Sequence, residues 1–202
     1  MAFPKISADP KYMAEKAAES SENDGDTFLF MGPVKTKSVY PAIEWILSEN
    51  EEKRFSSLTM VISSLGGHVT DCFALVDVML NSKIPITTYG IGGVASCGLT
   101  LFVCGELRLL GPHAFITSHQ YSGGLDGKHH ELVAERAAQD WTHEALINLY
   151  AGQLKLSRAY TESVFFGPSD RHFSAQAAVN VGLAHSIRGK AMGAVNPHCH
   201  DL

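Results

Sequence analysis

The chain has 202 residues, which is enough for one α/β domain with a substantial core, and its 45% hydrophobic content is that of an ordinary globular protein. A formal net charge of −5, without any cluster of lysine and arginine, argues against nucleic acid as a partner. The charged content of only 18% favours an oligomer that buries part of its surface.

The first 26 residues are polar and weakly patterned, and residues 12–20 could form a short helix. Residues 1–10 have neither a basic start nor an apolar run, so no secretory signal is expected and we predict a cytoplasmic protein. We place one domain at residues 27–187 and a tail at residues 188–202, and we see no internal repeat.

Apolar periodicity predicts an alternation of strands and helices through this domain. In chain order we expect a strand at 28–31, a helix at 38–49, a strand at 58–63, a helix at 69–81, a strand at 84–90, a glycine turn and a helix at 99–104, strands at 107–110 and 114–117, and helices at 128–153, 159–164 and 175–181. Such alternation is typical of an α/β fold with parallel crossovers.

Residues 84–105 carry no charge, and the run is long enough to suggest a membrane span. It contains Pro85 together with Gly90, Gly92, Gly93 and Gly98, which suit a buried strand, a turn and a buried helix better than a continuous transmembrane helix. We therefore expect no membrane association.

The four cysteines, Cys72, Cys97, Cys104 and Cys199, show no paired spacing, as expected for reduced thiols. His198 and His200 flank Cys199 near the chain end, but two histidines there are a poor metal site. We therefore expect no metal and no cofactor.

Two glycine-rich segments each follow a strand and precede a helix: Ser64-Leu65-Gly66-Gly67 and Gly92-Gly93-Val94-Ala95-Ser96. In a parallel sheet both lie at the carboxyl ends of strands, where ligands bind. Ser96 could then act as a nucleophile, with the N–H groups of Gly67 and Cys97 directed at a developing oxyanion. The glycines could equally serve close packing of helix on strand. Neither segment has the Gly-Lys-Ser/Thr ending of a phosphate loop.

His119 follows an apolar strand, and a base at a strand end can be held rigidly. Asp170 lies in a loop before the last helix, beside Arg171. Taken singly, a structural histidine and a solvated ion pair remain open readings of these two residues. Together with Ser96 they form a candidate Ser-His-Asp triad, in an order that differs from those of chymotrypsin, subtilisin and the α/β-hydrolases.

These segments resemble the proteolytic subunit family of Clp proteases (ClpP, serine peptidases of the S14 type). The resemblance covers residues 28–187 and rests on several pieces in the same order and separation: Phe28-Leu29-Phe30-Met31-Gly32, Ile62-Ser63-Ser64-Leu65-Gly66-Gly67, Gly93-Val94-Ala95-Ser96-Cys97-Gly98, Ser118-His119-Gln120 with Gly123-Gly124, Ser169-Asp170-Arg171-His172-Phe173-Ser174-Ala175 and Val179 to Ile187.

The resemblance implies a ClpP/crotonase-like spiral of repeated β-β-α units with a protruding long helix. It implies that Ser96 is the nucleophile, His119 the general base and Asp170 the residue that orients His119. The Gly67 and Cys97 N–H groups would form the oxyanion hole. Extended runs after Gly67 and around residues 122–124 would pair with a substrate strand, with contacts from Gly66, His68, Ser122 and Gly124.

The same resemblance implies a homo-oligomer of two stacked seven-membered rings that encloses the active sites. The substrates would be unfolded polypeptides, supplied by a separate AAA+ unfoldase, and the peptidase itself would bind no nucleotide or metal. Leu65 and Tyr121 stand where the family commonly has proline, and Cys97 where it has methionine. Residues 1–26 diverge most, in the region that the family uses as an axial gate.

Two alternatives stay open at this stage. A non-catalytic ring subunit would keep the fold and lose the triad, although here all three residue types are present. A crotonase-type acyl-CoA enzyme shares the α/β spiral and the paired N–H groups, but it would not need serine, histidine and aspartate at these three positions.

Overall fold

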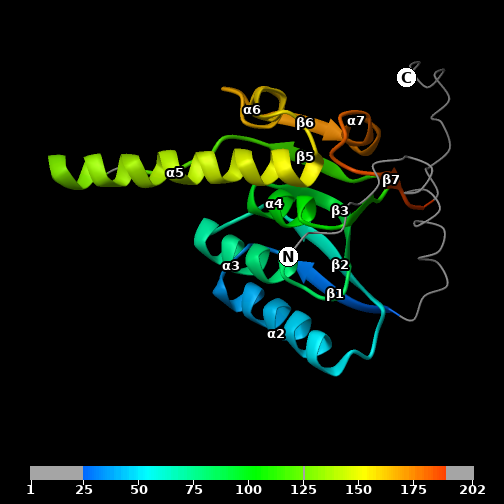
Figure 1. Ribbon diagram of the computed structural model, residues 1–202. Coiled ribbons are helices and arrows are strands. Elements are labelled where there is room, and N and C mark those ends of the chain that lie inside the picture. The colour runs from blue at the N-terminus through cyan, green and yellow to red at the C-terminus, as the bar shows by residue number, and fades with distance from the viewer. Residues whose placement is uncertain (1–24, 125, 190–202) are drawn as a thin grey trace, which may run out of the picture.

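The computed structural model describes residues 25–124 and 126–189 (Figure 1). Its centre is a sheet in which five strands pair in parallel in the order β1-β2-β3-β4-β7. These are β1 (Gly25–Met31), β2 (Ser57–Ser64), β3 (Ile86–Ala95), β4 (Leu107–Leu110) and β7 (Ser186–Ile187). The predicted α/β class with parallel crossovers is confirmed.

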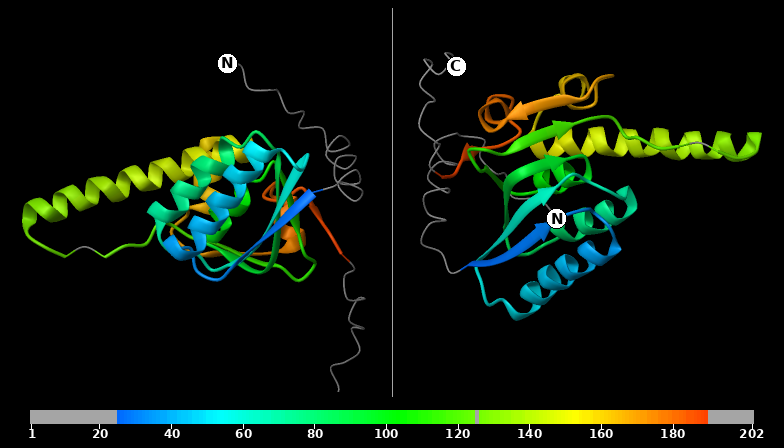
Figure 2. Two further views of the ribbon diagram at one scale, coloured as in Figure 1. Left: turned by 90° about the horizontal axis from the view of Figure 1, so that it is seen from below. Right: turned by 180° about the vertical axis from the view of Figure 1, so that it is seen from behind.

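Six helices accompany the sheet in the described residues: α2 (Thr36–Glu52), α3 (Val69–Leu80), α4 (Cys97–Val103), α5 (His129–Leu154), α6 (Arg158–Phe165) and α7 (Ala175–Asn180). Helices α2, α3 and α4 pack in succession, and α4 also contacts α5. The N-terminal part of α5 extends well beyond the globular body in all three ribbon views (Figures 1 and 2). The long protruding helix implied by the resemblance is therefore present.

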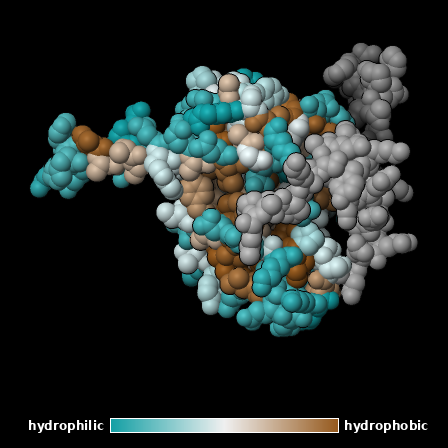
Figure 3. Space-filling view, in the orientation of Figure 1, coloured by the Kyte–Doolittle hydropathy of each residue, from teal (hydrophilic) through white to brown (hydrophobic). Residues whose placement is uncertain are grey.

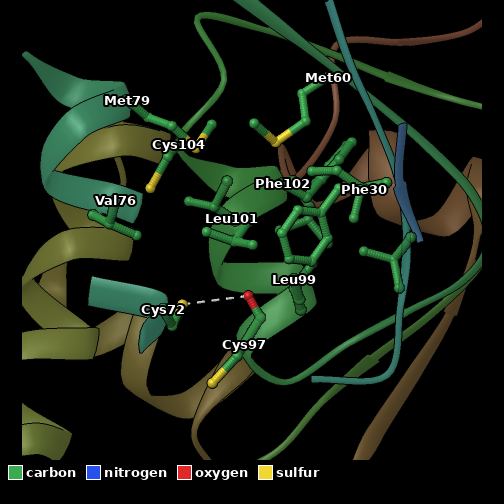
Figure 4. Close-up of a cluster of buried hydrophobic side chains, with 14 of the residues drawn as sticks. Phe30, Met60, Cys72, Val76, Met79, Cys97, Leu99, Leu101, Phe102 and Cys104 are labelled. Atoms are coloured by element: carbon green, nitrogen blue, oxygen red, sulfur yellow. Dashed lines mark hydrogen bonds between the residues drawn. The ribbon is translucent and has the colours of Figure 1, made fainter. Parts of the chain in front are cut away.

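The sequence pattern explains how the layers join. Every second residue of β2 is buried, namely Leu58, Met60, Ile62 and Ser64, as expected when the strand turns one face to the core. Val39, Ala42 and Ile46 of α2 recur at helical spacing and are likewise buried. The all-apolar helix α4 lies in the middle, with Leu99, Leu101 and Phe102 inaccessible to solvent (Figure 4).

Strand β3 corrects one expectation. The turn predicted at Gly92-Gly93 is wrong, because the chain stays extended as far as Ala95. The first half of β3 pairs with β4, from Thr87 to Gly90, and the second half pairs with β5 (Phe115–Ser118). Gly92 has φ +57°, and the β2–β3 register shifts between Ile62 and Ser64. The glycines therefore let one strand leave β4 and join β5.

Strands β6 (Arg171–Ser174) and β7 were not predicted. Strand β6 pairs antiparallel with β5, in a register that sets Thr117 opposite His172 and Ser118 opposite Arg171. The expected N-cap of the last helix is confirmed, since Ser174 Oγ accepts a hydrogen bond from Ala177 N–H at 3.2 Å. The predicted helix at 12–20, Cys199 and its flanking histidines, and most of the two terminal segments lie outside the described residues.

Candidate active site

Ser96 stands at the junction between β3 and α4, where its carbonyl accepts from Thr100 N–H at 3.0 Å. Its φ of +52° is rare for a residue with a side chain. The other two non-glycine residues with positive φ in the described ranges, Lys53 and Lys155, end helices, where this conformation is common. Backbone strain of this kind costs about 1–3 kcal/mol and is found most often at functional sites.

The loop after β2 lies directly against this serine. A Cβ atom on Gly66, which has φ +103°, would lie only 2.6 Å from Ser96 Cβ and 3.0 Å from Ser96 Oγ. Val34 holds the loop from the other side, since Val34 N–H donates to Gly66 O and His68 N–H donates to Val34 O, both at 2.9 Å. A side chain on Gly67 would collide with Val34 O. Only glycines allow the loop to pass between Val34 and Ser96.

His119 is positioned through its two neighbours at the end of β5. Ser118 Oγ donates to Phe165 O at 2.6 Å, and Gln120 Nε2 donates to Phe166 O at 2.9 Å. These bonds fix the backbone on both sides of His119 to the C-terminal end of α6. The imidazole Nδ1 lies 2.5 Å from Gln120 O. The base candidate is thus held in place by the chain around it.

Asp170 is exposed and immediately precedes β6. No hydrogen bond joins it to His119 in the described structure, but the ladder places the two residues in line. The last antiparallel pair of β5 and β6 is Ser118 with Arg171. In an antiparallel ladder the residue number rises by one on one strand and falls by one on the other at each pair. The next pair would therefore be His119 with Asp170.

A cavity of about 60 Å³ opens beside Ser96. It is lined by Gly67, Val69, Ser96, Cys97, Leu99, Thr100, Ser118, His119, Gln120, Tyr121, Ser122, Leu146, Tyr150 and Phe166. Leu146 and Tyr150 come from α5 and are buried, and Tyr150 OH lies 3.3 Å from Thr100 Oγ1. Nucleophile and base candidates therefore share one partly apolar cavity.

Comparison with known proteins agrees with this geometry. A family model described as "Clp protease" matches residues 22–191. The chain belongs to the Clp protease family. It is 33% identical over 153 residues to the "ATP-dependent Clp protease proteolytic subunit 2" of Corynebacterium diphtheriae, covering 73% of this chain and 74% of that protein. The protein of the same name from Corynebacterium efficiens is 33% identical over 156 residues, covering 75% and 76%. Membership of this family favours a peptidase over an acyl-CoA enzyme.

The predicted site residues of this Clp protease family member fall into two groups. Ser96, His119, Gly67, Cys97 and Ser122 all line the cavity. The others, Asp170, Gly66, His68 and Gly124, are not among its lining residues.

His68 and Gly124, two of the residues expected to contact a substrate strand, lie outside the cavity lining. His68 Nδ1 lies 3.2 Å from Asp71 Oδ2 at the start of α3, and Gly124 is exposed. The run expected to be extended after Gly67 is short, because α3 already begins at Val69.

Three cysteines lie in or next to α4: Cys97 is its first residue, Cys104 follows its last residue, and Cys72 of α3 contacts Cys97. Cys97 Sγ donates to Gly67 O at 3.3 Å, and Cys72 Sγ donates to Cys97 O at 3.5 Å. Hydrogen bonding with the Cys72 thiol lowers the pKa of Cys97, whereas the same interaction and burial raise the pKa of Cys72 well above its usual value. Burial raises the pKa of Cys104 to about 12.

Sequence reasoning missed the part of the cavity that α5 supplies. Leu146, Ile147, Tyr150 and Leu154 are the buried residues of this helix, and their spacing marks an apolar face. That periodicity predicts burial, but it does not say which neighbouring element covers the face. The contribution of α5 to the cavity could therefore not be found from sequence.

Within residues 25–124 and 126–189, no group of three or more His, Cys, Asp or Glu side chains is placed to hold a metal ion. No helix in the same described ranges is long and apolar enough to cross a membrane.

Proposed function

We propose that this Clp protease family member is a serine endopeptidase that hydrolyses peptide bonds in unfolded polypeptides, with Ser96, His119 and Asp170 as its catalytic triad. The observation that carries the proposal is the shared cavity: Ser96, in a strained conformation at a strand–helix junction, lines it together with His119. Nucleophilic acyl transfer by a serine requires a base within reach of its hydroxyl, and His119 lines the same cavity as Ser96.

In the proposed reaction Ser96 Oγ attacks the carbonyl carbon of the scissile bond while His119 Nε2 takes the hydroxyl proton. His119 then gives that proton to the departing amine, and a water molecule hydrolyses the acyl-enzyme by the same route. The Gly67 and Cys97 N–H groups stabilise the oxyanion, and a single donor of this kind is worth about 2.7–4 kcal/mol in other serine peptidases. Cys97 replaces methionine at a position where only the main-chain N–H is needed.

Asp170 would orient His119 after one small rearrangement. The β5–β6 ladder gains one pair, His119 Nδ1–H leaves Gln120 O, and it donates to the Asp170 carboxylate instead. The carboxylate then stabilises the charged imidazole that forms during the attack. The active conformation thus lies one ladder step from the arrangement described here.

The substrate is proposed to bind as an added strand between the Gly66–His68 loop and the segment around Ser122 and Gly124, so main-chain hydrogen bonds provide most of the affinity. The partly apolar cavity beside Ser96 accepts the side chain on the acyl side of the scissile bond. Leu146, Tyr150 and Phe166 in its lining favour an apolar residue there.

The subunit is proposed to assemble as two stacked seven-membered rings in the cytoplasm, with a separate AAA+ unfoldase that supplies unfolded chains. Two features support assembly: the protruding helix α5, and large apolar side chains exposed on the body, among them Leu29, Met31, Tyr40, Leu47 and Leu65. Apolar side chains gather on the face seen in Figure 3, whereas the projecting end of α5 is largely hydrophilic. Patches of this kind in a monomer usually mark contact surfaces.

The decisive experiment compares the wild type with Ser96→Ala, using a short fluorogenic peptide and a serine-reactive phosphonate. We expect the wild-type protein to turn over the peptide and to take up the phosphonate at Ser96. The variant should do neither, because the nucleophile is gone and a serine peptidase retains only a residual rate without it. An unchanged oligomer mass by light scattering would show that the variant still assembles. Absence of labelling in an assembled wild-type protein would indicate the alternative, a non-catalytic ring subunit.

A further inference from the structure

We propose that Cys97 and Cys72 form an oxidisable thiol pair: Cys97 is a modification site for hydroperoxides, and its oxidation ends in a disulfide to Cys72 that lowers peptidase activity. The proposal rests on the proposed function only for its effect on activity. The formation of the disulfide itself can be tested without it.

The first support is the position of the two thiols. Cys97 is the first residue of α4 and Cys72 lies in the first turn of α3, and the two helices are packed against each other. Cys72 Sγ donates to the carbonyl of Cys97 at 3.5 Å, which places the Cys72 thiol against the main chain of Cys97. Figure 4 shows both side chains at the same end of the buried cluster. A short side-chain movement therefore brings the sulfurs together.

The second support is that the two thiols differ in access. Both thiols are buried, Cys97 at 5% and Cys72 at 1% exposure, but only Cys97 is among the residues that line the cavity with Ser96 and His119. A small oxidant that enters the cavity meets Cys97 first. Cys72 lies behind it, where a resolving thiol would have to be.

Acidity points in the same direction. The neighbouring Cys72 thiol lowers the pKa of Cys97 despite the opposing effect of burial, while the pKa of Cys72 is raised. The thiolate is the form that reacts with peroxides, and thiols that respond to oxidants combine a lowered pKa, access and a nearby second thiol. Cys97 meets these three conditions.

The chemistry balances with a hydroperoxide as the only oxidant. The Cys97 thiolate attacks the peroxide, whose O–O bond breaks; one oxygen stays on Cys97 as sulfenic acid and the other leaves as an alcohol or water. The Cys72 sulfur then attacks the sulfenic sulfur and water departs. Two thiols are oxidised to one disulfide, and one hydroperoxide is reduced.

The disulfide changes the candidate oxyanion hole. In the reduced protein the Cys97 thiol donates to Gly67 O and so joins the two residues that supply the N–H groups. Bonding to Cys72 removes this donor and draws the Cys97 side chain towards α3. We expect peptide turnover to fall at least about tenfold, since losing one oxyanion donor entirely costs about 10²–10³ in kcat.

The test exposes the full-length assembly to hydrogen peroxide, in a Cys199→Ser background so that only three thiols remain. Peptides are then mapped under non-reducing conditions, and turnover is measured before oxidation, after oxidation and after a dithiol reductant. We expect a Cys72–Cys97 linked peptide that appears in parallel with the loss of turnover and disappears when the dithiol restores it.

Two variants act as matched controls. In Cys72→Ser the hydroxyl can still donate to Cys97 O, but no disulfide can form; excess peroxide should carry Cys97 to the sulfinic acid, and a dithiol should not restore turnover. Cys104→Ser alters another buried thiol, seven residues further along α4, and should respond like the parent. Oxidised parent protein without the Cys72–Cys97 linked peptide would overturn the proposal. If the linked peptide forms on oxidation but the protein cleaves no peptide even before oxidation, the result would contradict the proposed function alone.

Discussion

The absence of a side chain at residue 66 decides how closely the loop after β2 approaches Ser96. Two features require glycine at residue 66: its φ of +103°, and the lack of space for a Cβ atom beside Ser96. At Gly32 only the positive φ requires glycine. Gly32 has φ +93°, and a Cβ atom there would meet nothing within 4 Å. Comparing alanine substitutions at these two positions therefore distinguishes the effect of backbone strain from the effect of displacing Ser96.

We predict that Gly66→Ala and Gly32→Ala both destabilise the protein, by about 1–2 kcal/mol each, because an L-residue is strained at such φ. Only Gly66→Ala should also lose activity, by about a hundredfold or more, since its Cβ displaces Ser96 and small misplacements can cost about 10² in rate. Denaturant unfolding and peptide turnover measure the two effects. Equal turnover in both variants would show that Gly66 does not position the serine.

A second residue-scale effect concerns His185, which is packed on the buried Arg108. Arg108 N–H donates to His185 Nδ1 at 2.9 Å, and the guanidinium Nη2 lies 3.2 Å from Nε2. Burial first, and then the positive charges of Arg108 and Lys155, lower the pKa of His185 to about 3. Burial also lowers the pKa of Arg108 to about 10.

This environment makes stability depend on pH with a definite sign. Below pH 6.5, the ordinary pKa, the unfolded chain binds a proton at His185 that the folded protein does not bind until about pH 3. The folded state should therefore lose stability as pH falls from 6.5 towards 3. Thermal unfolding over this range should show a weaker pH dependence for His185→Gln than for the wild type, with exposed His113→Gln as the control. A slope unaffected by His185→Gln would contradict the assignment.

At the scale of elements, the pairing of β5 with β6 controls the position of Asp170, the acid of the proposed triad. Thr117 Oγ1 lies 3.0 Å from His172 Nδ1, and the His172 ring stacks on Phe115 with centroids 5.4 Å apart. Both contacts involve His172, whose pair with Thr117 is next to the pair of Ser118 with Arg171 in the ladder. They should stabilise the further pair that brings Asp170 to His119.

We predict that His172→Ala lowers kcat about fivefold to tenfold with little change in KM. The lost hydrogen bond is worth about 1 kcal/mol, which converts to roughly that factor in rate if Asp170 is then misplaced. Thr117→Ser keeps the hydroxyl and should keep the activity. A wild-type kcat in His172→Ala would show that this part of the ladder does not support the acid.

The elements that sequence predicted well are those whose own pattern specifies them. Helices α2 and α3 carry apolar residues at helical spacing, and β2 is a short run rich in apolar residues, so the sequence predicts each within a few residues of its observed bounds. Strand β6 has no alternation of its own and exists because β5 offers it a partner. From the sequence alone the glycines of β3 indicate the end of a strand. In the structure they allow the same strand to bend, so that it pairs first with β4 and then with β5.

The same distinction applies to the candidate site. Ser96 and His119 were predicted as site residues because each follows a strand in a recognisable local context, and both line the cavity. The part of the cavity contributed by Leu146 and Tyr150 depends on how α5 packs against α4, which is a tertiary property. Whether Asp170 meets His119 depends on a single step of strand pairing, which a local motif does not encode.

At the scale of the whole molecule, the projecting end of α5 and the exposed apolar side chains of the body gain a role only in an assembly. In the proposed stacked rings the active sites face an enclosed chamber. Entry then depends on the size and folding state of the substrate, which a single subunit would not distinguish.

We predict that the purified assembly cleaves short peptides without ATP, whereas a stable folded protein survives the same treatment. The physical reason is access, because cleavage of an extended strand requires an unfolded chain inside the chamber. Light scattering gives the mass of the assembly, and gel electrophoresis follows the folded substrate over time. Digestion of the folded protein without a partner would contradict an enclosed chamber.

The left-handed conformation of Ser96 has an implication for the history of such chains. Glycine would relieve the backbone strain at this position, so replacing Ser96 by glycine would make the folded state more stable. In a related subunit that lacked the proposed peptidase activity and served only as a scaffold, glycine at residue 96 would make the folded protein more stable. Serine at that place is thus a residue that the fold tolerates and that only chemistry would retain.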